Sequence, residues 1–416
     1  MISGPLNVVV AGGGVAALET VLALRALAED RVTIDVLAPD EAFTYRPLEV
    51  GGPFRLGNPR RYSLAAIAES HGATLHQDTL HRVDWERRIA TGSSGEMHTY
   101  DALVVAVGAR PEPALPGALT YTGRRDAPEL RHVLGELRSG AASSVAFVVP
   151  YGASWPLPVY ELALLTAAEV HDAPTNPRIL LVTPEQRPLE LFGRPAGDEI
   201  AKLLLASGIE FHGSARPVRV AGDELLLAGD AGALPADRVV ALPRLVGRRI
   251  RGLPPSRHDG FIATDGHGRV FGAEGVWAAG DIADYRVKQG GLAAQQADAV
   301  AQDIAAVAGA PVAPQPFEPV LRGLLLTGAT PRYLRGGRAP GVDAASDHAL
   351  WWPPSKIAAR YLSAYLGAAQ DHSLLGPDAA PGSVPIEVRL EREWQADHPT
   401  RPVAPSFHGV TSPGAR

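Results

Sequence analysis

Hydrophobic positions near the start of the chain alternate between short apolar runs and a longer helical pattern. Leu6 to Val10 is an apolar run, a glycine cluster interrupts it, and Leu18 to Ala28 is rich in alanine and leucine at helical spacing. Arg31 to Leu37 follows as an alternating, strand-like segment. A strand, a glycine turn, a helix and a second strand predict a βαβ unit with a parallel sheet.

The same pattern recurs further along. Strands are predicted at Asp101 to Val107, Val145 to Val149, Arg178 to Val182 and Trp277 to Ala279, and a long helix at about Leu292 to Val307. The run from Val145 begins a second strand–turn–helix block, so the pattern predicts an α/β fold. A proline-rich hinge from Pro311 to Pro319 introduces a separate C-terminal module.

The first glycine turn has the spacing of a dinucleotide-binding turn. Gly12, Gly14 and Ala17 fit G-x-G-x-x-G/A between a strand and a helix. The first glycine allows the tight turn, the second lets the backbone approach a pyrophosphate, and the small third residue lets the helix pack on the strand. An acidic residue usually ends the second strand of such a unit, but Ala38 stands there. Asp40 either replaces this acid or is a solvated turn residue.

Composition narrows the possible functions. A chain of 416 residues is long enough for two or three domains, and 46% hydrophobic with 20% charged residues describes a folded protein. A net charge of −6 argues against nucleic acid as the main partner. The sequence has no apolar run long enough to span a membrane, and the N-terminus lacks a basic region and a cleavage signal. We therefore expect a cytoplasmic protein.

Cysteine and histidine usage excludes further chemistry. The chain contains no cysteine, which excludes disulfides, thiolate nucleophiles and cysteine-ligated metal clusters. Its 13 histidines form no H-x-x-x-H or H-E-x-x-H pair, so no metal site is expected.

Three groups of segments resemble known flavoproteins. Residues 100–111 resemble the strand and turn that pass FAD in flavoproteins with two dinucleotide folds, and residues 260–262 with 276–281 resemble their second FAD fingerprint. Residues 43–48 and 287–291 are similar to segments of sulfide:quinone oxidoreductases and type II NADH dehydrogenases. In order and spacing the resemblance covers Asn7 to Pro331, and it places the chain in the FAD-dependent pyridine nucleotide-disulfide oxidoreductase superfamily.

The resemblance implies two Rossmann-like domains and FAD as the cofactor. Because no cysteine is available for a thioether link, we expect non-covalent FAD, although composition alone does not exclude a histidyl or tyrosyl link. It places the FAD domain at residues 1–116 and 257–316, a degenerate second dinucleotide-type domain at 117–256, and a flavin-covering C-terminal module at 317–416. In that fingerprint the aspartate, here Asp281, binds ribityl hydroxyls. The cofactor-binding residues expected from the turn and the resemblance are Gly12, Gly14, Ala17, Asp40, Arg46, Pro47, Gly108, Arg110, Gly280, Asp281, Lys288 and Gln289.

The chain also departs from these relatives. Without cysteine it cannot use the sulfur chemistry of sulfide:quinone oxidoreductases. The second turn, where a nicotinamide dinucleotide would bind, contains Pro150, Trp155, Pro156 and Pro158. Proline donates no N–H and tryptophan hinders close backbone approach, so ordinary NAD(P)H binding is not expected.

Glu161 and Lys288 are the candidate catalytic residues. Glu161 resembles the glutamate that type II NADH dehydrogenases hold near the flavin, where burial would let it relay a proton to a quinone. The alternative is a glutamate favoured by a helix N-terminus. Lys288 follows the second fingerprint, where a cation stabilises the reduced, anionic flavin. The alternative is a surface lysine.

The C-terminal module contains an amphipathic segment. Ser355 is a candidate N-cap, and Ile357, Tyr361, Ala364 and Tyr365 would then share a helical face. That face suits peripheral membrane contact beside a lipid quinone, or else core or homodimer packing. One further strand is predicted at Ile386 to Leu390 in the tail.

The expected function is an FAD-dependent oxidoreductase that resembles sulfide:quinone oxidoreductase but lacks cysteine chemistry. It would pass electrons from an unidentified donor to an acceptor, with quinone as the candidate. Two alternatives stay open: an NAD(P)H:quinone or NAD(P)H:acceptor reductase, and a non-catalytic flavoprotein that acts as a redox sensor or partner-binding protein.

Overall fold

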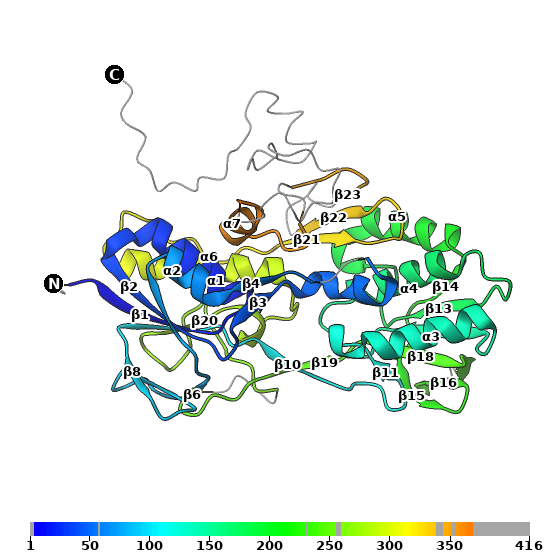
Figure 1. Cartoon of the computed structure of the whole chain (residues 1–416), viewed down its shortest axis with the longest axis horizontal. Coiled ribbons are helices and arrows are strands. Elements are labelled where there is room, and N and C mark those ends of the chain that lie inside the picture. The colour runs from blue at the N-terminus through cyan, green and yellow to red at the C-terminus, as the bar shows by residue number, and fades with distance from the viewer. Residues whose placement is uncertain are drawn as a thin grey trace, which may run out of the picture.

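In this computed structural model, the described residues are 4–56, 59–229, 232–254, 259–337, 344–351 and 355–368. They form two parallel sheets side by side, with a smaller antiparallel layer across one face, as Figure 1 shows. This arrangement confirms the predicted α/β class. The domain boundaries themselves stay predictions.

The first sheet is parallel and has the strand order β20-β9-β1-β2-β5. Its strands are β1 (Leu6–Ala11), β2 (Val32–Leu37), β5 (Ala73–His76), β9 (Ala102–Val105) and β20 (Val276–Ala278). Both faces are covered, which explains why β9 is a continuous apolar run whose four residues are all buried. One face packs against α1 (Val15–Ala28) and α6 (Gly290–Val307), which also contact each other.

The other face of the first sheet packs against a three-stranded antiparallel sheet. This sheet consists of β6 (Leu80–Asp84), β7 (Ile89–Gly92) and β8 (Met97–Thr99). Leu37 of β2 shares a core with Leu80 and Ala90 of the added sheet. The hairpin β3 (Ala42–Thr44) and β4 (Arg61–Ser63), the 3-10 helix η2 (Arg46–Phe54) and the helix α2 (Leu64–Ser70) complete this half of the molecule.

The second sheet is also parallel and has the order β11-β18-β12-β13-β14. Its strands are β11 (Leu119–Thr120), β12 (Ser144–Val148), β13 (Arg178–Val182), β14 (Ile209–His212) and β18 (Arg238–Ala241). One face carries α3 (Ala127–Ser139), α4 (Leu157–Val170) and α5 (Gly193–Ala206), and the other carries β15 (Pro217–Ala221), β16 (Glu224–Leu227) and β17 (Ala233–Pro235). The antiparallel pair β10 (Ala109–Glu112) and β19 (Arg244–Gly247) connects the two sheets (Figure 1).

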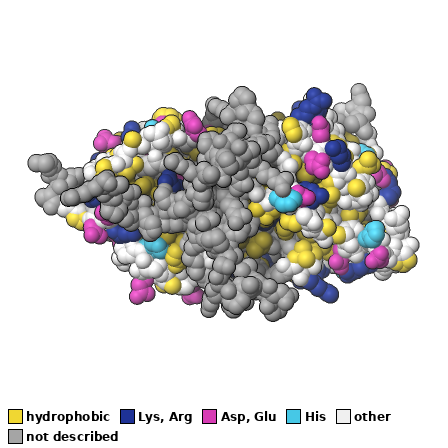
Figure 2. Space-filling view, turned by 90° about the horizontal axis from the view of Figure 1, so that it is seen from above, with side chains coloured by type: hydrophobic (Ala, Val, Ile, Leu, Met, Phe, Trp, Pro, Cys, Tyr) yellow, Lys and Arg dark blue, Asp and Glu magenta, His cyan; other side chains and the backbone are white. Residues whose placement is uncertain are grey.

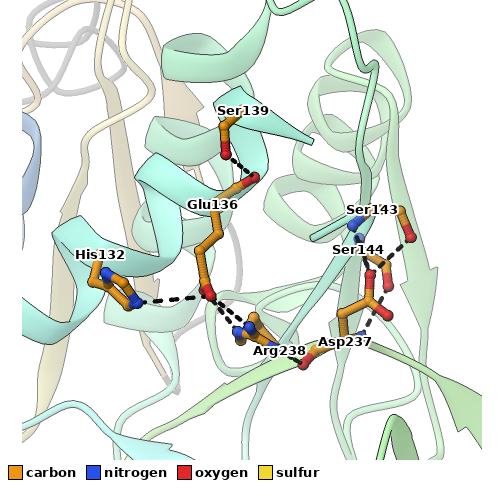
Figure 3. Close-up of polar contacts among 7 residues, drawn as sticks. All are labelled: His132, Glu136, Ser139, Ser143, Ser144, Asp237 and Arg238. Atoms are coloured by element: carbon orange, nitrogen blue, oxygen red, sulfur yellow. Dashed lines mark hydrogen bonds and ion pairs between the residues drawn. The ribbon is translucent and has the colours of Figure 1, made fainter. Parts of the chain in front are cut away.

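Polar contacts fix one end of the second sheet, as Figure 3 shows. Arg238 of β18 donates two hydrogen bonds to the Glu136 carboxylate of α3, at 2.7 and 2.5 Å. The neighbouring Asp237 carboxylate accepts from the Ser143 amide and hydroxyl at 2.6 and 2.8 Å. The Asp237 amide in turn donates to the Ser144 hydroxyl at 2.9 Å, so the starts of β12 and β18 are held together.

The C-terminal layer consists of β21 (Val320–Leu325), β22 (Arg332–Gly337) and β23 (Ala344–Ser346), followed by α7 (Leu362–Ala368). β21 contacts both α4 and α6, so this layer bridges the two halves.

On the face seen in Figure 2, acidic and basic side chains of described residues are interspersed at both ends. Among the described residues, none of the helices combines the length and apolar character that a bilayer-spanning segment requires.

The predicted helix that begins after Ser355 is wrong. Residues 355–361 are not helical, and α7 begins only at Leu362. The Ser355 hydroxyl donates to the Ile357 carbonyl at 2.7 Å, and the Ile357 amide donates to the Tyr45 hydroxyl at 2.8 Å. A local side-chain bond and a tertiary bond therefore take the place of helical hydrogen bonds in this segment.

The apolar face predicted for that segment belongs largely to the core. Ile357, Tyr361 and Ala364 are buried, and the Trp351 indole packs edge-on against Tyr333 with ring centroids 5.1 Å apart. The amides of Tyr361 and Leu362 donate to the buried Glu19 carboxylate at 2.9 and 2.6 Å, which fixes the start of α7. These side chains are not available to a membrane surface. The strand predicted at 386–390 lies outside the described residues.

Candidate functional site

The first glycine turn leaves space in front of α1. Gly12 has φ +138°, and a Cβ there would lie 2.3 Å from the Ala106 carbonyl oxygen, so only glycine fits against β9. Gly14 is exposed, and a Cβ there would meet nothing within 4 Å. Ala17 is fully buried where α1 packs on the sheet. The first turn of α1 contains no acidic residue, so its amides and dipole favour an anion such as a pyrophosphate.

The second fingerprint lies against the same helix. Gly280 has φ +78°, and a Cβ there would approach the Ala16 methyl group to 2.9 Å. The Gly280 amide donates to the Gln296 side chain at 2.8 Å, which holds η6 (Gly280–Ile282) between α1 and α6. Burial raises the pKa of Asp281, and the positive charges of Lys288 and Arg46 partly offset this shift. The assignment of these residues to the pyrophosphate and ribityl chain of FAD stays a prediction.

A cavity of about 310 Å³ lies where the two halves and the C-terminal layer meet. Its volume falls at the lower end of the range that is usual for small-molecule sites. η2 contributes Arg46 and Pro47, η6 contributes Asp281, and the segment before α6 contributes Lys288. Glu161, Trp155, Leu324 and Lys356 line the remaining sides. Six of the predicted site residues line this cavity: Arg46, Pro47, Glu161, Asp281, Lys288 and Gln289.

Glu161 and Lys356 form a buried ion pair at this cavity. The Lys356 ammonium donates to both carboxylate oxygens of Glu161, at 2.5 and 2.7 Å, and to the Pro47 carbonyl at 3.1 Å. The Leu326 amide donates to Glu161 at 2.8 Å. Both side chains are at most 5% exposed. Burial raises the pKa of Glu161, while the charge and hydrogen bonds of Lys356 oppose the shift. The carboxyl can therefore hold a proton closer to neutral pH than an exposed glutamate.

Lys288 is also buried and lines the same cavity. Its ammonium donates to the Ala283 carbonyl and lies 3.9 Å from the centre of the Phe261 ring, a cation–π contact. Burial lowers the pKa of Lys288 to about 8, although the negative charges of Asp281 and Asp284 oppose this. The alternative of a surface lysine is wrong, because Lys288 is only 7% exposed.

The remaining predicted residues lie at different places. Gly108 has φ +68° and open space around its Cβ position, which suits a turn that passes a ligand. Asp40 is exposed in the loop between β2 and β3, and both alternatives for its role stay open. Arg110 is exposed on β10, where it pairs with Glu112 at 2.6 Å, and it does not line the cavity. Gln289 caps α6 by accepting from the Leu292 amide at 2.9 Å.

The second turn is crowded, as the sequence predicts. Pro156 stands at the N-cap of α4 and Pro158 in its first turn, so neither can donate an N–H to a phosphate. Trp155 packs edge-on against Phe192, with ring centroids 5.8 Å apart, and lines the cavity.

Sequence reasoning missed Lys356 as a site residue. It considered the segment around this lysine only as an amphipathic face for a membrane, the core or a homodimer. Glu161 and Lys356 are 195 positions apart, and the pair forms because α4 and the coil before α7 meet over the cavity. The local signal was a lysine next to the apolar residues 357–359.

Comparison with known proteins decides the family. Residues 6–297 match the model of the pyridine nucleotide-disulphide oxidoreductase family, which is most of the chain. The chain belongs to this family. Membership makes it a flavin-dependent oxidoreductase. The disulphide in the family's name has no counterpart here, because the chain has no cysteine.

Solved structures share the fold of this family member. The sulfide:quinone oxidoreductase of Aquifex aeolicus matches with a TM-score of 0.73 and 17% identity, covering 82% of this chain and 86% of that one. The ferredoxin reductase of the CYP199A2 system from Rhodopseudomonas palustris matches with a TM-score of 0.61 and 20% identity, covering 79% and 81%. No curated protein sequence matches the chain. At these identities the structural likeness establishes the fold alone.

Proposed function

We propose that the protein binds FAD and transfers electrons to a quinone, with Glu161 and Lys356 handling the proton. Support for FAD comes from the open space before α1 at Gly14 and the close approach of Gly280 to α1. FAD, when bound, supplies the two-electron chemistry. The observation that supports a quinone as the electron acceptor is the buried Glu161–Lys356 pair, which lines the cavity.

The pair suits an acceptor that takes up protons. Conversion of a quinone to a hydroquinone consumes two electrons and two protons, so a proton must reach a quinone oxygen. Glu161 has a raised pKa, and Lys356 hydrogen-bonds to both of its carboxylate oxygens. A protonated pair at the cavity wall can deliver one proton to that oxygen and be reprotonated from solvent, while the other proton would come with the electrons from the reduced flavin. An acceptor that takes electrons alone would not need this pair.

Glu161→Gln tests this role. The amide keeps the size of the side chain and an acceptor for Lys356 but cannot release a proton. In anaerobic stopped-flow mixing of dithionite-reduced protein with a water-soluble quinone, reoxidation is expected to slow by about 10²-fold or more. Reoxidation by ferricyanide, which takes electrons without protons, serves as the control and should not change. Equal quinone rates in the variant and the wild-type protein would refute the proton role.

Reduction by NADH and NADPH is expected to be slow or absent. Pro156 and Pro158 remove amide donors from the start of α4, and Trp155 occupies the approach. Anaerobic absorbance of the flavin band after mixing gives the rate, with dithionite as the control for full reduction. Complete bleaching within seconds at submillimolar NADH would contradict the prediction and favour an NAD(P)H:acceptor reductase.

Lys288→Met is expected to lower the flavin midpoint potential. A lysine ammonium has three donors, and one of them binds the Ala283 carbonyl. If another binds the reduced flavin, a charge-assisted bond contributes about 1.5–3 kcal/mol. For a two-electron couple, about 1.4 kcal/mol corresponds to about 30 mV, so the drop is roughly 30–65 mV.

The pH dependence of the midpoint potential tests whether the positive charge of Lys288 causes this difference. Because burial lowers the pKa of Lys288 to about 8, the side chain is charged below that pH and neutral above it. The difference between the wild-type and Lys288→Met potentials should therefore be largest at pH 7 and below, and shrink above pH 8. Spectroelectrochemical titrations of the wild-type protein and of Lys288→Met at several pH values measure these potentials. Identical potentials at pH 7 would show that Lys288 does not act on the flavin.

A further inference from the structure

Two histidines and a glutamate meet at the edge of the first sheet, away from the cavity. His76 ends β5, His98 lies in the middle of β8, and Glu96 precedes that strand. Each offers one ligand atom, and these atoms all lie within 4.8 Å of one another. The His76 and His98 rings are edge-on, with centroids 4.6 Å apart.

A fourth residue orients His76. The His76 Nε2 lies 2.9 Å from the Asp35 carboxylate in β2, so this nitrogen is the one that carries the proton. The Nδ1 atom is then a lone-pair donor, and it lies 3.9 Å from the Glu96 carboxylate. A carboxylate that holds one nitrogen of a histidine while the other faces a metal is the usual arrangement at zinc sites.

The environment of His98 also indicates a ligand at this position. It is only 8% exposed, and its Nε2 atom is buried with no hydrogen-bond partner among the described residues. A buried polar atom without a partner costs free energy that a ligand would recover. Near His98, the groups that could offset this cost are a second imidazole and a carboxylate, which are both metal ligands.

We propose that His76, Glu96 and His98 bind a divalent transition-metal ion, with zinc as the metal that this ligand set fits best. Two imidazoles and one carboxylate form a known zinc ligand set, and the fourth position would be filled by water. In tetrahedral zinc sites, ligand atoms bound at about 2.0–2.2 Å lie roughly 3.3–3.5 Å apart, so metal binding would draw this group together by up to about 1.5 Å. Glu96 is exposed, which gives it freedom to close the site.

The ion would connect the first sheet to the strands that cover it. β5 is the edge strand of the first sheet, and β8 is the edge strand of the covering sheet. The Ala38 amide, beside the glycine turn, donates to the His76 carbonyl at 3.1 Å. Metal binding would therefore stabilise the edge of the sheet next to that turn. This inference does not depend on the proposed electron acceptor.

The sequence could not indicate this site. His76 and His98 are 22 positions apart, with Glu96 between them, and this spacing fits no known metal motif. The site forms because β6, β7 and β8 return the chain to the edge of β5. The expectation of no metal site rested on local spacing alone.

Zinc titration of the flavin-loaded, chelator-treated full-length protein tests the proposal. Isothermal titration calorimetry should show one zinc ion bound per chain, and the thermal midpoint should rise with zinc. Asp35→Asn, which weakens the orienting contact, should reduce the affinity about 10–100-fold, and His98→Ala should reduce it at least as much. The control His171→Ala removes an exposed histidine at the end of α4 and should bind zinc like the wild-type protein.

Glu96→Gln keeps the test decisive if His98→Ala does not fold. Glu96 is exposed, so its substitution should leave the apo protein as stable as wild type while zinc affinity falls at least tenfold. The proposal is overturned if no saturable binding is seen with zinc in excess. Binding that is equally tight in Glu96→Gln and in the wild-type protein also overturns it, because the ion would then be held elsewhere.

Discussion

Gly14→Trp is expected to abolish FAD binding while leaving the fold in place. Gly14 is exposed in an extended conformation, and a Cβ there meets nothing within 4 Å, so a side chain can leave the backbone here without a clash at its first atom. The indole would instead fill the space in front of α1 that a pyrophosphate needs. If the pyrophosphate loses two charge-assisted hydrogen bonds from backbone amides at the start of α1, at about 1.5–3 kcal/mol each, FAD binding weakens by about 10²-fold or more.

Fluorescence titration of the apo protein with FAD measures this loss, and circular dichroism checks the fold. Gly135→Trp is the matched control, because a Cβ at Gly135 in α3 also meets nothing within 4 Å, yet this helix lies in the other half of the molecule. This control should bind FAD normally. A Gly14→Trp variant that retains its yellow colour through purification would mean that the pyrophosphate does not lie at this turn.

Lys356→Met is expected to destabilise the protein by about 3–5 kcal/mol. The substitution leaves the Glu161 carboxyl at 1% exposure, with the Leu326 amide as its remaining hydrogen-bond donor among the described residues. Removing one partner of a buried pair leaves a charge without compensation, whereas removing both is far less costly. The double variant Glu161→Gln, Lys356→Met should therefore recover most of the loss.

The pH dependence gives this prediction a second readout. Burial raises the pKa of Glu161 in the folded state, so the folded protein holds a proton that the unfolded chain releases. The stability of Lys356→Met should therefore fall as the pH rises through the range above the ordinary glutamate pKa. Urea unfolding at several pH values measures the free energy of unfolding of Lys356→Met. Lys202→Met, which breaks the exposed pair with Glu199 at 3.4 Å, is the control and should cost about 0.5 kcal/mol or less. A loss of that size in Lys356→Met would contradict the burial argument.

Local pattern was sufficient to predict the first glycine turn. The turn of Gly12 and Gly14 was predicted from its place between a strand and a helix, and the structure shows the close approach at Gly12 and the open space at Gly14. The fingerprint around Asp281 was predicted from resemblance, and it lies against α1. Such turns can be predicted from sequence because the backbone geometry of a few adjacent residues specifies them.

The C-terminal segment shows where local pattern failed. Periodicity predicted a helix after Ser355, but backbone amides of this segment donate hydrogen bonds to the Tyr45 hydroxyl and the Glu19 carboxylate, which hold 355–361 in an irregular conformation. Those partners lie more than 300 positions away in sequence, so no local window contains them. Tertiary contacts overrode the helical spacing.

Four features follow from the amino-acid sequence alone: the α/β class, the first glycine turn, the absence of cysteine chemistry and the crowded second turn. Each of these depends on the identity or spacing of neighbouring residues. Only the tertiary structure decided that Lys356 pairs with Glu161, that Lys288 is buried beside Phe261, and that His76 meets His98. These three contacts join segments that are distant in the chain, and packing of the sheets and layers, rather than local propensity, sets which of them meet.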